Sequence, residues 1–94
     1  MSEDERLVRP DGLVIRGLRH GRGWSLRDLA AAITESHRTA TGLPMQIAPR
    51  VLSAIEERNA LVPYATLLWI GAGLDANPVE LMLEDPPSPG ATRH

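Results

Sequence analysis

The chain has 94 residues, of which 43% are apolar and none is cysteine, and its formal net charge at pH 7 is −2. This length fits one domain with a small core, and the lack of cysteine excludes disulfides and thiolate metal sites. No apolar run approaches the roughly 20 residues of a membrane-spanning helix, and the acidic start of the chain lacks the layout of a secretory signal. We therefore expect a cytoplasmic protein with no membrane partner.

The charge is unevenly distributed along the chain. Residues 6–58 contain nine arginines and five acids, whereas the other residues contain one arginine and seven acids. A basic region between acidic ends is typical of a protein that turns one side towards nucleic acid. The alternative is that the acidic ends only keep the chain soluble.

The chain divides into three segments. Residues 1–10 are expected to form a flexible arm that ends at Pro10, and the proline-rich residues 85–94 a disordered tail. Between them, residues 11–84 are expected to form an all-α domain of five helices. Apolar residues recur there mainly at a 3.6-residue period, and no alternating stretch indicates a strand.

Caps and breakers mark the first two helices. Asp11 can cap a first helix that Gly21 ends, and Ser25 with Asp28 resembles a capping box for a second. Nothing interrupts the second helix until about residue 40. The side chains expected to be buried in these helices are Val14, Ile15, Leu18, Leu26, Leu29, Ala30 and Ile33.

Three further helices are expected over residues 49–58, 63–73 and 78–83. A proline begins each of them, where its missing N–H costs nothing, and Asn77 caps the last. The side chains expected to be buried in the third and fourth helices are Val51, Leu52, Ile55, Tyr64, Leu67, Leu68 and Gly71.

Five short motifs in this order resemble the helix-turn-helix domain of the phage-repressor-like (XRE) family. They are Ile15-x-x-Leu18-Arg19, Gly23-x-Ser25-x-x-x-Leu29-Ala30, Leu52-Ser53-x-Ile55-Glu56, Pro63-x-x-x-Leu67-Leu68 and Leu74-Asp75-x-Asn77-Pro78-x-x-Leu81. The resemblance implies a five-helix DNA-binding fold whose third helix enters the major groove. It further implies a sequence-specific transcriptional regulator, a repressor that binds double-stranded DNA without a cofactor.

The chain departs from the family pattern in three places. Ala30 and Ile55 lie 25 positions apart, which is longer than the family's tight turn and is similar to regulators from high-GC bacteria. We expect the surplus, residues 34–46, to extend the second helix and to form a surface loop beside the DNA. Leu26 replaces a glutamine that in the family often contacts the DNA backbone, and the third helix has few polar side chains.

The outward side of the third helix carries the candidate contacts. Arg50 there can bind O6 and N7 of guanine, a contact worth about 1–3 kcal/mol of discrimination, or it can simply pair with a nearby acid. The candidate base-reading residues are Gln46, Pro49, Arg50, Ser53 and Ala54. The candidate contacts to the DNA backbone, which position the protein without specifying sequence, are Ser25, Arg27, Arg38, Arg58 and Asn59.

Reading two half-sites requires two such domains, so the resemblance implies a homodimer. The fourth and fifth helices are expected to present an apolar interface made of Trp69, Val79, Met82 and Leu83. Alternatively, Trp69 only completes the small core.

No catalytic or metal site is evident. The three histidines lack metal spacing, and the glycines of residues 17–23 have no preceding strand that would make a phosphate loop. We therefore expect no enzyme, no metal and no cofactor. The alternative to a DNA-binding regulator is a protein-interaction module on the same fold, such as an antitoxin-like partner or an adaptor.

Overall fold

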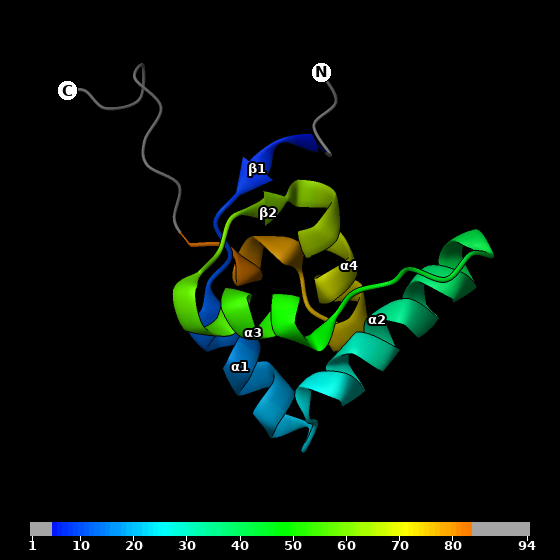
Figure 1. The fold of residues 1–94 in the computed structure, drawn as a ribbon, viewed down its shortest axis with the longest axis horizontal. Helices are drawn as coiled ribbons and strands as arrows, with labels where there is room; N and C mark the ends of the chain where they lie inside the picture. Colours follow the sequence, from blue (N-terminus) through cyan, green and yellow to red (C-terminus); the bar gives the residue numbers. More distant parts are fainter. Residues whose placement is uncertain (1–4, 84–94) are drawn as a thin grey trace.

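The computed structural model describes residues 5–83, which form a mainly helical domain with a small two-stranded sheet (Figure 1). The helices are α1 (Gly12–Gly21), α2 (Leu26–Thr41), α3 (Pro49–Arg58), α4 (Tyr64–Leu74) and the 3₁₀ helix η2 (Pro78–Leu81). Strands β1 (Leu7–Val8) and β2 (Val62–Pro63) run antiparallel, with Leu7 opposite Pro63 and Val8 opposite Val62. Helix α3 lies against α1 and α2, while α4 packs mainly on α2.

The expectation of five helices and no sheet is wrong in its details, although the mainly helical class is confirmed. The fifth helix is a single 3₁₀ turn of four residues, because the chain becomes extended at Met82. There Met82 pairs with Pro10 in an isolated bridge, and the Leu83 N–H donates to the Arg9 carbonyl at 3.0 Å. Met82 and Leu83 therefore pair with the N-terminal segment and do not continue the helix.

That N-terminal segment is not a flexible arm over residues 5–10. Val8 is only 4% exposed, Pro10 is buried, and the Tyr64 N–H donates to the Arg6 carbonyl at 2.8 Å. Residues 1–4 of the expected arm, and the tail expected at 85–94, lie outside the described residues.

Helix ends follow the local capping chemistry. Asp11 accepts a hydrogen bond from the Val14 N–H, and Ser25 and Asp28 form a reciprocal capping box, as predicted. Helix α2 continues to Thr41, where Gly42 adopts a left-handed conformation with φ of 83°. Helix α4 begins one residue after Pro63 and runs through Gly73 to Leu74, so Gly73 does not end it.

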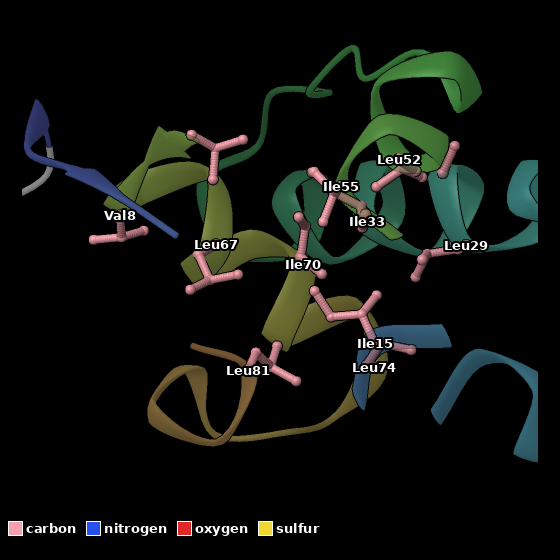
Figure 2. Close-up of a cluster of buried hydrophobic side chains, with 12 residues drawn as sticks. Val8, Ile15, Leu29, Ile33, Leu52, Ile55, Leu67, Ile70, Leu74 and Leu81 are labelled. Atoms are coloured by element: carbon pink, nitrogen blue, oxygen red, sulfur yellow. The ribbon is translucent and has the colours of Figure 1, made fainter. Parts of the chain in front are cut away.

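The core draws side chains from every helix, and Figure 2 shows them converging between α1, α2, α3, α4 and η2. Its fully buried apolar members are Ile15, Leu29, Ile33, Leu52, Ile55, Leu67, Ile70, Leu74 and Leu81. The burial predicted for Val14, Leu18 and Val51 is wrong, because all three are exposed. Helix α4 buries Ile70 and Leu74 rather than Tyr64 and Leu68, which are only half-buried.

Two glycines allow the helices to approach closely. A Cβ on Gly12 would overlap the carbonyl oxygens of Ile55 and Glu56 in α3. A Cβ on Gly73 would lie 2.9 Å from Cγ1 of Ile33 in α2. Glycine is therefore the residue that lets α1 rest on the end of α3 and α4 rest on α2.

We predict that Gly12→Ala lowers the free energy of unfolding by about 1–3 kcal/mol, because α1 must move away from α3. The matched control is Gly17→Ala in the same helix, where a Cβ would meet no atom within 4 Å. That control should stabilise the protein by about 0.5–1 kcal/mol through helix propensity alone. Urea unfolding of both variants tests this, and equal effects would refute the close packing.

Candidate nucleic-acid interface

A buried ion pair holds α3 against α1. The Arg19 guanidinium donates to both carboxylate oxygens of Glu56, from Nε at 2.7 Å and from Nη2 at 2.8 Å. It also donates from Nη1 to the Trp24 carbonyl at 2.8 Å, which ties the turn between α1 and α2 to the same site. Arg19 is 9% exposed and Glu56 5%, so the pair sits inside the fold.

The electrostatics of this pair are set by its hydrogen bonds. The hydrogen bond to Glu56 raises the pKa of Arg19 above its ordinary value, against the desolvation that lowers it, and the opposite charge of Glu56 adds to the rise. Because a guanidinium is not deprotonated in proteins, burying Arg19 buries a charge. Arg16 adds a longer contact, Nε to Glu56 Oε1 at 3.4 Å, from a partly exposed position.

Sequence reasoning missed this pair, although a signal was present. Arg19 follows Ile15 by one helical turn, and Glu56 follows Leu52 by one turn, so both stand at core-facing positions. A charged residue at such a position is rarely buried unless it is paired. The two residues could have been matched to each other on that ground.

The C-terminal end of α3 is fixed by Asn59. This residue adopts a left-handed conformation with φ of 51°, and its Oδ1 accepts a hydrogen bond from the Gly12 N–H at 2.8 Å. Its carbonyl accepts from Arg9 Nη1 at 3.2 Å. Asn59 therefore has a structural role in the fold, and its assignment as a DNA-backbone contact stays a prediction.

The outward side of α3 carries one basic and one acidic residue. Arg50 and Glu57 are both exposed, and seven residues on a helix place them about 20° apart on the same face. Ser53 donates its hydroxyl to Glu57 Oε2 at 3.0 Å, so this predicted base reader is engaged by a carboxylate. Pro49 and Ala54 are half-buried beside Arg50.

The arginine side chains fall into two groups, those with a partner within the described chain and those without one. Side chains of Arg9, Arg16, Arg19, Arg22 and Arg38 have a hydrogen-bonding or ionic partner within the chain. Arg27, Arg50 and Arg58 are exposed and make no hydrogen bond or ion pair with any residue from 5 to 83. These three belong to α2 and α3, and all three were predicted to contact DNA.

The other predicted backbone contacts are only partly available. Nε of Arg38 lies 3.8 Å from Oε1 of Glu35. Such an exposed ion pair is weak, so a DNA phosphate can replace the glutamate. The Ser25 hydroxyl accepts from the Asp28 N–H at 3.1 Å and keeps its own proton to donate. Gln46 is exposed in the connection before α3.

The surplus of residues 34–46 extends α2 and then returns along it, as Figure 1 shows at the side of the molecule. Thr34 donates its hydroxyl to the Met45 carbonyl at 2.7 Å, and Nδ1 of His37 lies 2.5 Å from the Leu43 carbonyl oxygen. Met45 packs against the core. The helix extension is thus confirmed, and the connection after it lies at the surface, with residues 42–44 and Gln46 exposed and Met45 anchoring it.

The residues predicted for the dimer interface do not form one exposed patch. The Trp69 ring packs edge-on against His37 in the extended part of α2, with centroids 4.5 Å apart. Met82 and Leu83 are half-buried by the N-terminal segment. Of the four, only Val79 is strongly exposed, at 70%.

Residues 5–83 contain no pocket and no cluster of side chains suited to a metal ion. Within the same range, no helix is both long and apolar enough to cross a membrane. No known protein family, curated protein or solved structure matches the chain. The chemistry that the described surface offers is therefore that of its exposed side chains, above all the unpartnered arginines of α2 and α3.

We predict that Arg19→Ala lowers the free energy of unfolding by about 3–5 kcal/mol, because it leaves the Glu56 carboxylate buried without its partner. Arg16→Ala is the matched control and should cost less than about 1 kcal/mol, since that contact is longer and partly exposed. The double variant Arg19→Met/Glu56→Leu should recover most of the loss. Denaturant unfolding measures all three, and a mild effect of Arg19→Ala would contradict the role given to the pair.

Proposed function

We propose that this protein is a sequence-specific regulator that binds double-stranded DNA through α2 and α3. The observation that carries the proposal is the location of Arg27, Arg50 and Arg58, which are exposed and unpartnered within residues 5–83. Guanidinium groups that the fold leaves without partners are suited to phosphate and to guanine. Arg9, Arg16, Arg19 and Arg22 instead have acceptors within residues 5–83.

Arg50 is the residue that best fits base reading. It is the second residue of α3, and its side chain is exposed at the N-terminal end of that helix. An α-helix fits the major groove, where an arginine can donate two hydrogen bonds to O6 and N7 of one guanine. Half-buried Ala54, one turn along the same side, leaves room for close approach and suits contact with a thymine methyl group.

The flanking cations suit phosphate rather than bases. Arg27 lies in the first turn of α2 and Arg58 at the last residue of α3. We assign both to the DNA backbone, with Ser25 and Arg38 as further candidates, because such contacts hold the helix in register without reading sequence. One domain reads few base pairs, so we propose that two copies bind a two-half-site operator as a repressor.

The second candidate function is a protein-interaction module. It is favoured by exposed apolar side chains at several places, above all Leu13 at 74%, Val79 at 70% and Leu43 at 65% exposure. A partner protein that covers them would leave the α3 arginines without effect on its binding. Purification with a stoichiometric partner, together with no salt-dependent DNA binding, would favour this function.

We predict that Arg50→Ala weakens binding to the operator by about 1–3 kcal/mol and relaxes the preference for one guanine. Arg27→Ala should weaken operator and scrambled duplexes alike and lower the salt slope by about one unit. The operator is first selected from genomic fragments, and titrations at several salt concentrations then compare the variants.

A chemical control refines the Arg50 assignment. Replacing the selected guanine by 7-deazaguanine removes the N7 acceptor, so it should weaken the wild type but leave Arg50→Ala unaffected. Equal losses for Arg50→Ala on operator and scrambled DNA would reduce Arg50 to a phosphate contact. No binding by the wild type to any selected fragment would refute the proposed function.

Glu57 provides a test of opposite sign. Its side chain is exposed on the same side of α3 as Arg50, about two helical turns away. The negative charge repels phosphate groups near α3. We predict that Glu57→Gln raises affinity for all duplexes by roughly two- to fivefold at low salt, with the gain lost as salt screens the charge. Glu80→Gln in η2 is the matched control, because it changes the net charge equally on an exposed residue away from α3. Equal gains for both variants would indicate only a net-charge effect.

A further inference from the structure

One side of α1 is apolar and remains partly exposed within the described chain. Leu13, Val14 and Leu18 are 74%, 36% and 37% exposed. Gly17 and Gly21 lie between them on the same side, and a Cβ on either would meet no atom within 4 Å. At about 100° per residue, these five positions span an arc of about 140° that carries no charged group.

The opposite side of α1 is the one that meets α3. Gly12 lies against the α3 backbone, Ile15 is fully buried, and Arg19 forms the ion pair with Glu56. A protein that covers the apolar side therefore does not cover α3. Element η2 also contacts α1 and carries the exposed Val79.

We propose that this face, Leu13, Val14, Gly17, Leu18 and Gly21, is where a second copy of the chain binds, with the two α1 helices antiparallel about a two-fold axis at Gly17. The proposal comes from the shape of α1 itself. Leu13 and Gly21 are each four residues from Gly17, so antiparallel pairing brings the largest exposed side chain of each copy onto the bare glycine of the other. A two-fold interface requires such self-complementarity, since each residue meets its counterpart reciprocally.

Charge favours the same arrangement. Asp11 caps the N-terminal end of α1, and the exposed Arg22 stands at its C-cap. Antiparallel pairing about Gly17 places Asp11 of one copy beside Arg22 of the other, and it also opposes the two helix dipoles. Parallel pairing would instead bring like ends together.

The size of the face sets the strength expected. Ten residues make a helix about 15 Å long. One face of so short a helix buries less than the roughly 800 Å² per partner of a standard interface. We therefore expect a weak dimer, with a dissociation constant on the order of 10–100 µM. Because α1 is separate from the proposed DNA contacts of α3, this association is independent of whether α3 binds DNA.

The test is sedimentation velocity of the full chain without DNA, over about 5 to 500 µM to bracket that constant. The wild type should show reversible dimer formation. Gly17→Glu and Gly17→Arg should each be monomeric, because two like charges would meet on the axis, and a Cβ at position 17 meets no atom within 4 Å in the monomer. An equimolar mixture of the two variants should form a heterodimer.

Leu13→Glu should raise the dissociation constant by roughly a hundredfold, because each dimer loses two buried leucines. Leu43→Glu is the matched control, since Leu43 is 65% exposed outside α1, and it should dimerise like the wild type. Circular dichroism confirms that each variant is folded. A wild type that is monomeric throughout, dimers that survive the Gly17 substitutions, a mixture that fails to pair, or a monomeric Leu43→Glu would each overturn the proposal.

Discussion

The ion pair between Arg19 and Glu56 decides how α3 is presented. Burying two charges is costly, and a well-packed apolar pair could give equal stability. The pair adds a constraint on direction, because the planar guanidinium meets the carboxylate with two hydrogen bonds at 2.7 and 2.8 Å and holds the Trp24 carbonyl with a third. That geometry fixes the rotation of α3 about its axis, and Arg50 faces outward as a consequence.

Local chemistry explains which parts of the fold could be predicted. The caps Asp11, Ser25 and Asn77 bond to N–H groups two or three residues away, so the sequence nearby determines them. The two-residue strands have no periodicity, and they exist because Val8 and Val62, far apart in the chain, pair in space. Helix α4 is apolar on nearly all sides, so spacing alone could not distinguish its buried side from the half-buried Leu68.

The sequence predicts where the candidate DNA-contacting arginines lie, but it does not predict which arginine side chains are bound within the fold. The sequence places Arg27, Arg50 and Arg58 on exposed helix faces, and the structure agrees. It does not distinguish them from Arg19 or Arg22, whose acceptors are a carboxylate in α3 and the Leu74 carbonyl. Trp69 was assigned to an interface because Tyr64, Leu67, Leu68 and Gly71 were expected to fill the inward side of its helix. The extra turns of α2 bring His37 over that ring.

The two sides of α1 reverse the usual division of a surface helix. The side that meets α3 holds a glycine, an isoleucine and a buried arginine, whereas the side that faces outward holds two leucines, a valine and two glycines. Folding alone does not require a leucine at position 13, which is 74% exposed, since a polar residue there would leave the core contacts of α1 unchanged. The glycines strengthen this argument, because within a helix they lower stability relative to alanine and neither makes a close contact in the monomer. These residues become favourable when a second helix packs closely on α1, because a leucine of one helix can then pack against a glycine of the other.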